Sequence, residues 1–181
     1  GAYGYSAATG RVYVFHSTGS PGVTITAAAS ADTVVTGEAY STFGHSVAMG
    51  DGNGDGYTDV VAGAPALTGR VYVFHSTGSA GVTTTAAASA SAVVTGEGGS
   101  TFGWSVASGD VNGDGYADLV AGAVLYSDST GRVYVVHSTG GLGVPTTAAA
   151  SASTVITGET TQNLFGGSVA VGDVTGDGYA D

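Results

Sequence analysis

The chain alternates short apolar segments with turns rich in Gly, Asp, Ser and Thr, and this pattern recurs along its length. In one unit, clear apolar segments lie at 46–49, 59–62 and 70–74, and a weaker one lies at 92–95. Their β-branched and aromatic residues, bounded by Gly and Asp, predict strands. We interpret the intervening segment 79–91 as an extended loop plus strand, because its small residues form no amphipathic helical face.

Internal repeats indicate how these strands are organised. Near-copies of Arg-Val-Tyr-Val-Phe-His-Ser-Thr-Gly begin at Arg11, Arg70 and Arg132, at nearly equal spacings. A repeat of about 60 residues with four strands is typical of a propeller blade, whereas β-solenoid repeats are much shorter. The sequence therefore predicts an all-β fold: a β-propeller domain over residues 1–181, with three four-stranded repeats. The repeat units are 11–69, 70–131, and 132–181 together with 1–10.

Each repeat also contains an acidic segment of nine residues, at 51–59, 110–118 and 173–181. Oxygen side chains stand at positions 1, 3, 5 and 9, and position 7 offers a backbone carbonyl, which suits a hard cation with six to eight oxygen ligands. Glycines at positions 4 and 6 allow a tight turn, and three carboxylates this close repel one another without a counter-ion. We therefore predict about three calcium ions per chain. The predicted ligands are Asp51, Asn53, Asp55, Tyr57, Asp59, Asp110, Asn112, Asp114, Tyr116, Asp118, Asp173, Thr175, Asp177, Tyr179 and Asp181.

Acidic β-turns are the alternative for these segments, since Asn-Gly and Asp-Gly also mark hairpins. A turn has no need of the further Asp at positions 1 and 9, so calcium is favoured. The loop is not a standard EF-hand, because Ala62 and Ala121 stand where the bidentate Glu is required. Strand-like residues follow the loop, which places the ion in a β-hairpin connection. The third site is predicted to be the weakest, because no strand follows Asp181 in this sequence.

Composition narrows the range of partners. The chain has 14 acidic residues against three Lys and Arg, and a formal net charge of −11. So few cations disfavour nucleic acid and anionic membrane surfaces as partners. The chain has no cysteine, no signal peptide and no run of 18 apolar residues that would insert in a membrane. Together with the predicted calcium sites, this composition favours a secreted or cell-surface protein.

The motifs resemble a known repeat. The segment 43–48 reads Phe-Gly-His-Ser-Val-Ala, the acidic loop 51–59 follows it, and 62–65 reads Ala-Gly-Ala-Pro. This order resembles the FG-GAP repeat of integrin α-subunit propellers and their bacterial relatives. Val124 replaces the Pro in the second copy, and Thr175 stands where Asn is usual in the third. The resemblance implies a calcium-stabilised propeller whose family members mostly bind proteins or sugars.

Three blades are fewer than the four to eight of closed propellers. Residues 1–11 align without gaps to 122–132, and the sequence ends at the last Asp of the third acidic loop. One blade is thus split between the two ends of the chain. We predict a homodimer in which each chain completes a blade of the other, which gives six blades. The alternative is a fragment of a longer array.

Two sets of loops differ most among the repeats, and strand counting places them on the face opposite the acidic loops. They are 3–8, 65–67 and 124–129, and the blade-to-blade loops 39–42, 98–101 and 160–164. Loops on a rigid scaffold commonly carry binding residues, so this variable-loop face is the candidate surface for a protein or glycan ligand. Drift of unconstrained loops is the alternative. The aromatic residues available to the face are Trp104, Tyr40, Tyr126, Tyr3 and Tyr5.

Repetition argues against catalysis. Three His residues at strand ends and three Glu residues at blade junctions recur identically, whereas a catalytic triad or carboxylate pair needs one special geometry. We therefore predict that the protein is not an enzyme. The predicted function is that of a non-catalytic protein-interaction or adhesion module. The alternatives are a lectin, or a purely structural or engineered propeller fragment. A lectin should show repeated equivalent pockets, whereas Trp104 is unique. The repeated His residues are His16, His75 and His137, and the repeated Glu residues are Glu38, Glu97 and Glu159.

Overall fold

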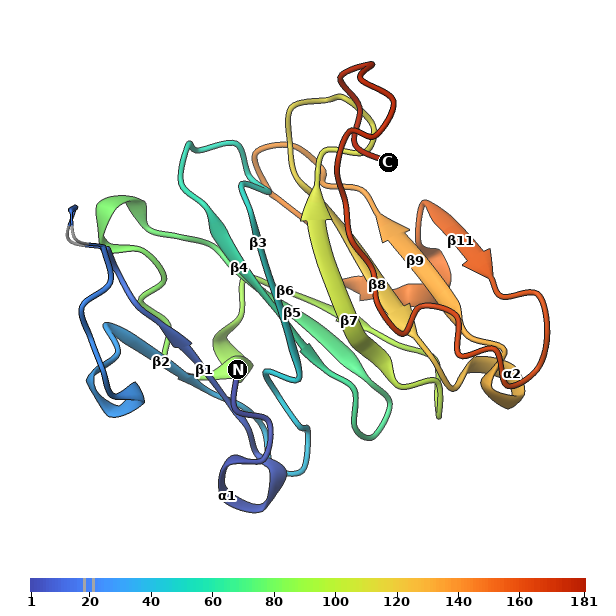
Figure 1. Cartoon of the computed structure of the whole chain (residues 1–181), viewed down its shortest axis with the longest axis horizontal. Coiled ribbons are helices and arrows are strands. Elements are labelled where there is room, and N and C mark those ends of the chain that lie inside the picture. Colours follow the sequence, from blue (N-terminus) through green and yellow to red (C-terminus); the bar gives the residue numbers. More distant parts are fainter. Residues whose placement is uncertain (18, 21) are drawn as a thin grey trace.

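A computed structural model describes residues 1–17, 19–20 and 22–181. Thr18 and Pro21, inside the first repeat unit, lie outside the described residues. Within the described residues, the strands form three sheets that follow one another in chain order (Figure 1). The all-β fold with antiparallel sheets is confirmed and fits a β-propeller.

The first complete sheet contains all four strands predicted for one repeat. They are β3 (Ser46–Gly50), β4 (Asp59–Ala64), β5 (Arg70–Phe74) and β6 (Ala92–Thr95), each antiparallel to the next. A two-residue strand, β10 (Thr147–Ala148), joins the outer edge parallel to β6. Every residue of β4 is buried, which explains its continuous apolar run.

The second complete sheet repeats this meander. Its strands are β7 (Phe102–Gly109), β8 (Asp118–Ala123), β9 (Arg132–Val136) and β11 (Thr154–Thr157). The inner strand β7 packs against β3 and β4 of the preceding sheet. Neighbouring repeats are therefore in direct contact through strands that the hydrophobic pattern identifies.

Two four-stranded meanders are complete among the described residues, and the strands predicted for the split blade form only in part. The remaining sheet is the pair β1 (Arg11–Val14) and β2 (Thr33–Thr36), and Arg11 also exchanges backbone hydrogen bonds with Ala2. At the other end, Gly172 and Asp181 exchange backbone hydrogen bonds, at the position where Gly50 is paired with Asp59 in the first complete sheet. Within 158–181 this pair is not extended into a strand.

Short helical turns replace part of the extended loops that we predict. The turns η1 (Ala28–Ser30), η3 (Ala87–Ser89) and η4 (Ala149–Ser151) are single 3₁₀ turns in the Ala-Ala-Ser segments, and η2 (Gly78–Ala80) is a fourth. A single turn closed by one i→i+3 bond needs no amphipathic face, which is why the pattern does not reveal it. Two further turns, α1 (Tyr5–Ala8) and α2 (Tyr126–Ser129), lie in the variable loops.

The core lies between consecutive sheets. Phe43 and Phe102, which enter the inner strands, are fully buried. Phe43 meets the Tyr72 ring edge-on at 5.5 Å, and Phe102 meets the Tyr134 ring in the same way at 5.4 Å. Phe43 also shares a buried cluster with Val12 and Val35 of the preceding sheet, so the Phe-Gly motif is a packing motif that joins one sheet to the next. In the described part of the chain, no helix is long and apolar enough to cross a membrane.

Candidate functional site

The acidic loops lie where the sequence places them. Loop 51–59 connects β3 to β4, loop 110–118 connects β7 to β8, and both are closed at their base by an antiparallel pair. The third loop, 173–181, is closed by the Gly172–Asp181 pair. All three loops lie at the same end of the sheets (Figure 1).

The first Asp of each loop is held by the backbone of its own turn. Asp51 accepts hydrogen bonds from the backbone N–H of Gly54 at 2.7 Å and of Gly56 at 2.9 Å. Asp110 and Asp173 make the equivalent bonds. The two glycines have φ of 70° and 85°, which side chains other than Gly rarely adopt. Hydrogen bonds from backbone N–H groups, that of Gly178 foremost, lower the pKa of Asp173. In the third loop the turn thus favours the ionised form of Asp173.

Positions 3 and 5 are joined to each other in the first two loops. The Asn53 amide donates to Asp55 Oδ2 at 3.2 Å, and the Asn112 amide donates to Asp114 Oδ2 at 2.9 Å. The side chain at position 3 of the third loop is the Thr175 hydroxyl, which has no amide N–H to donate in this way. The third loop therefore differs from the others in its side-chain bonds as well as in its exposure.

The ninth residue ties each complete loop to a neighbouring strand. Asp59 and Asp118 are fully buried, and each accepts one backbone N–H from its own loop. Each also accepts a backbone N–H from the second residue after the third strand of its sheet, which is Ser76 after β5 or Ser138 after β9. Burial raises the pKa of both carboxyls, and these hydrogen bonds oppose the shift. Asp181 is exposed, and in the described part of the chain its side chain accepts N–H groups from its own loop alone.

The predicted metal ligands of each loop are only partly close to one another. Within the described residues, no three His, Cys, Asp or Glu side chains group closely enough to hold a metal ion. The donor set of a loop also includes an amide or hydroxyl oxygen and a backbone carbonyl, and every one of these donors is oxygen. Such a set suits Ca²⁺ or Mg²⁺ and not the softer metals.

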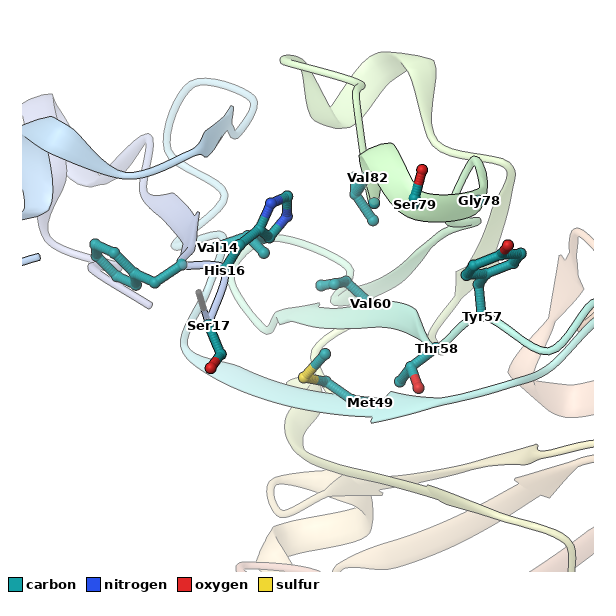
Figure 2. A pocket seen from close by; sticks show the side chains of 12 residues that line it. Val14, His16, Ser17, Met49, Tyr57, Thr58, Val60, Gly78, Ser79 and Val82 are labelled. Atoms are coloured by element: carbon teal, nitrogen blue, oxygen red, sulfur yellow. The ribbon is translucent and has the colours of Figure 1, made fainter. Parts of the chain in front are cut away.

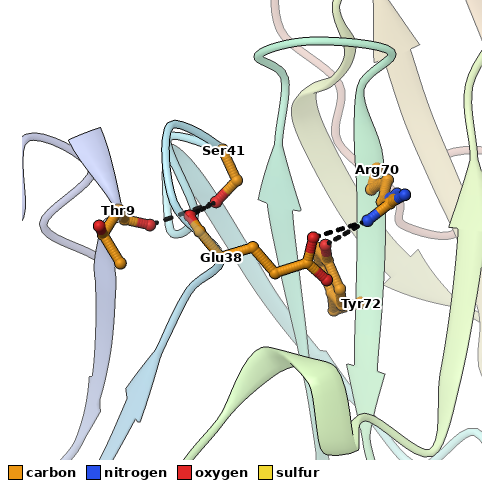
Figure 3. Close-up of polar contacts among 5 residues, drawn as sticks. All are labelled: Thr9, Glu38, Ser41, Arg70 and Tyr72. Carbon is orange, nitrogen blue, oxygen red and sulfur yellow. Dashed lines mark hydrogen bonds and ion pairs between the residues drawn. The ribbon is translucent and has the colours of Figure 1, made fainter. Parts of the chain in front are cut away.

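Ion pairs between repeated Arg and Glu residues bridge consecutive sheets. Arg70 of β5 contacts Glu38, which follows β2, at 2.8 Å, and its Nη1 also lies 3.4 Å from the Tyr72 hydroxyl (Figure 3). Arg132 of β9 contacts Glu97, which follows β6, at 3.4 Å. The repeated Glu and Arg residues therefore link blades, which supports a structural role.

Tyr134 gives this linkage a dependence on pH. Its hydroxyl donates to Glu97 at 2.7 Å, and burial together with this bond raises its pKa to about 12. Since an unfolded Tyr has a pKa of about 10, folding stability is complete below pH 10 and falls as the pH rises toward 12. Tyr134→Phe should cost about 1–2 kcal/mol at neutral pH, and thermal melts should show this deficit shrinking above pH 10. A deficit that is constant up to pH 12 would contradict the assignment.

The variable-loop face carries a row of aromatic rings. Tyr3 and His45 lie with ring centroids 5.1 Å apart, His45 and Trp104 lie 4.4 Å apart, and His45 Nδ1 is 3.0 Å from the Trp104 carbonyl oxygen. This row borders an open cleft of about 350 Å³, which Pro65 and Thr101 also line. Tyr5 and Tyr126 have another role, because the Arg11 and Arg132 guanidinium groups lie over their rings at 3.7 and 3.6 Å.

The backbone of the same face is strained. In the described residues, all twelve non-glycine residues with positive φ lie in its loops. Sequence reasoning missed this feature, because Ser, Thr and Tyr give no sign of a left-handed conformation. The residues are Ser6, Ala7, Ala8, Tyr40, Thr42, Leu67, Thr101, Ser127, Asp128, Ser129, Gln162 and Leu164.

Hydrogen bonds hold these loops together. Thr42 N donates to the Ala8 carbonyl at 2.8 Å, and the Thr42 hydroxyl accepts the N–H of Ala66 at 3.2 Å. The Thr101 hydroxyl likewise accepts the N–H of Leu125. Loops from adjacent sheets are therefore joined into a continuous surface.

Comparison with known proteins agrees with the motifs. The family model "FG-GAP repeat" matches residues 43–74 and 102–136. The chain is similar to integrin alpha-3 of Mus musculus, at 36% identity over 107 residues (55% of this chain, 10% of that protein). It is also similar to integrin alpha-7 of Rattus norvegicus, at 35% over 161 residues (83% and 13%), and to integrin alpha-IIb of Homo sapiens, at 41% over 92 residues (44% and 8%). The matched part thus spans about a tenth of each relative. The chain therefore carries FG-GAP repeats, in an all-β, propeller-like arrangement of sheets.

Proposed function

We propose that this chain is a calcium-stabilised, non-catalytic propeller scaffold that binds a protein partner through its variable-loop face, outside the cell. The observation that carries the proposal is the concentration of strained backbone and exposed aromatic rings on that one face. Non-glycine residues in the left-handed region each cost roughly 1–2 kcal/mol. Such strain persists where the surroundings enforce it, and it is frequent at ligand-binding sites.

The aromatic row suggests the class of ligand. Trp and Tyr supply much of the binding energy in protein interfaces, and Trp104 and Tyr3 keep 39% and 54% of their surface exposed. At the next blade junction Gly167 takes the position of Trp104, so the row occurs once. A lectin with equivalent pockets in each repeat is therefore the second candidate. A net charge of −11 favours a partner with a positive surface.

A catalytic role has little support in the arrangement of the repeated His residues. His75 Nε2 is buried without a hydrogen-bond partner among the described residues. A Cβ at Gly143 of the following repeat would come 2.5 Å from that atom, and a Cβ at Gly81 would come 2.9 Å from His16 Nε2. These imidazoles pack between repeats.

Calcium is proposed as the structural ion of the loops. In the first loop, Asp51, Asn53, Asp55 and Asp59 would hold it together with the Tyr57 carbonyl, and the other loops would use the equivalent residues. The Asp59 oxygens already accept backbone N–H groups, but a carboxylate has about four lone-pair sites, so capacity for a metal remains. When bound, the ion supplies positive charge that offsets the repulsion among the loop carboxylates. We further propose that a second copy closes the ring, giving a homodimer with six blades.

The ligand proposal is tested by binding to panels of extracellular proteins and of glycans. Trp104→Ala is expected to weaken binding to a protein at least tenfold, which corresponds to about 1.4 kcal/mol. Leu142→Ala is the matched control, because Leu142 is 82% exposed in a loop on the opposite face and should leave binding unchanged. Binding to glycans alone would favour the lectin. Protein binding that both substitutions leave unchanged would contradict the assignment of the face.

A further inference from the structure

An Arg–Glu ion pair links consecutive sheets at two places in the chain. One Arg and one Glu of the same repeated series, at opposite ends of the chain, form no such pair among the described residues. The internal pairs are Glu38–Arg70 and Glu97–Arg132. The remaining members of the series are Arg11 on β1 and Glu159 after β11, in the sheets that lie farthest apart (Figure 1).

Arg11 occupies the same local setting as Arg132. Its guanidinium lies 3.7 Å from the centre of the Tyr5 ring, and that of Arg132 lies 3.6 Å from the centre of the Tyr126 ring. Arg132 has the Glu97 carboxylate in addition, whereas Arg11 Nε is buried without a hydrogen-bond partner among the described residues. The site around Arg11 therefore lacks one group, and the two internal examples show that this group is the carboxylate of a preceding repeat.

At the opposite end of the chain, the last strand among the described residues, β11, lacks a neighbouring sheet to cover it. Val35, Val94 and Ile156 occupy the same position of strand 4 in the three repeats, and the next repeat covers the first two. Val35 and Val94 are 0% exposed, whereas Ile156 is 46% exposed. All four residues of β11 are exposed, while the equivalent strands β2 and β6 each contain buried residues. This face lacks the apolar cover that a following repeat provides.

The acidic loops follow the same series. The Tyr116 ring packs over Gly54 of the preceding loop, and the Tyr179 ring packs over Gly113. The remaining ring, Tyr57, borders an open cavity, and the remaining glycine, Gly176, has open space around it. Backbone hydrogen bonds link the loops in the same order. Ala117 N donates to the Asp51 carbonyl at 2.9 Å, and Ala180 N donates to the Asp110 carbonyl at 3.0 Å.

A cavity lies at the position where the next member of this series would fit. It has a volume of about 470 Å³ and is bounded by the end of β1, by Met49 of β3 and by Tyr57 and Thr58 of the first loop (Figure 2). In the second sheet, the equivalents of Met49 and Thr58 are Ser108 and Ala117, and these pack closely against Gly50 of the preceding repeat. Gly172 is the equivalent of Gly50 in the third repeat and has open space around it.

We propose that a second copy of this chain docks head to tail, with the Glu159 end of one copy seated on the Arg11 end of the other. Glu159 then pairs with Arg11 and Tyr13, β11 is covered at Ile156, and loop 173–181 enters the cavity beside Tyr57. This inference deepens the proposed ring closure, on which it rests, by assigning the surfaces. An interface that joins two different surfaces closes into a ring when its rotation permits, and here two copies complete it.

Charge reversal tests the assignment. The wild-type chain is expected to show the mass of two chains, each of 17.4 kDa, in light scattering at high micromolar concentration with calcium. Arg11→Glu and Glu159→Arg should each weaken the association at least tenfold, because each places like charges together. The double variant R11E/E159R restores an opposite pair and should recover the two-chain mass, and circular dichroism melts confirm that each variant is folded.

Two further measurements distinguish failure of this interface from failure of the proposed ligand face and calcium sites. Trp104→Ala should leave the mass unchanged, since Trp104 lies in β7, away from both ends of the row of sheets. Native mass spectrometry counts bound calcium in the same samples, so that empty loops are distinguished from a failed interface. A wild-type protein that keeps the mass of a single chain would overturn the inference, as would an oligomer indifferent to both single reversals.

Discussion

Asp114→Ala is expected to lower the melting temperature by roughly 5–10 °C in calcium and by far less in a chelator. A ligand that binds only the folded state at one hundred times its Kd stabilises it by about 2.7 kcal/mol, and for a chain of this length 1 kcal/mol corresponds to roughly 2–4 °C. Without calcium, the substitution removes only exposed hydrogen bonds from the Tyr116 N–H and the Asn112 amide. Thermal melts with added calcium and with chelator measure the difference.

Asp177→Ala provides the matched comparison in the third loop. Asp181 is exposed there, and among the described residues it accepts no hydrogen bond equivalent to the one that Ser138 donates to Asp118. The third loop is thus held less firmly, so we expect it to bind calcium most weakly and Asp177→Ala to change the melting temperature least. Equal losses for Asp114→Ala in calcium and in chelator would contradict a calcium site.

The sequence predicts the strands well because their determinants are local. Segments 70–74 and 92–95 are rich in β-branched residues between turns, and the structure has strands at both. The acidic loops are equally recognisable, since each first Asp is bound by glycine N–H groups only three and five residues later. Neighbouring residues decide these features, and the repeats present the same pattern several times.

Contacts between repeats are harder to derive from the pattern. The backbone N–H of Ser76 holds Asp59 from 17 residues away, and the His45–Trp104 contact joins residues 59 apart. The pattern gives the class of each residue but not which loop crosses which, because that depends on how one sheet packs on the next. The apolar segment 168–171 ahead of the third acidic loop forms no strand for a related reason: a strand needs a partner for its backbone hydrogen bonds.

Gly122→Ala is expected to destabilise the fold by about 3 kcal/mol, at the upper end of the usual range for an overpacked core. Gly122 lies in β8, and a Cβ there would collide with the Gly166 carbonyl of the next repeat and with the Ser105 hydroxyl. Gly63 in β4 stands in the same position against Gly103 and Ser46. The backbone carbonyl has no rotamer with which to move aside, so the two repeats must separate. The Ala-Gly-Ala motif therefore reflects close approach of one blade to the next.

Gly98→Ala is the matched control, since it adds the same methyl group in a loop where no atom lies within 4 Å of the new Cβ. It should leave stability unchanged or raise it slightly, because Ala restricts the unfolded chain more than Gly does. Urea unfolding of both variants separates the two effects: Gly122→Ala should lower the midpoint, and Gly98→Ala should not. Equal midpoints would mean that the sheets tolerate a wider spacing at Gly122, and the close contact of the Phe-Gly and Ala-Gly-Ala segments would then not be what fixes the distance between blades.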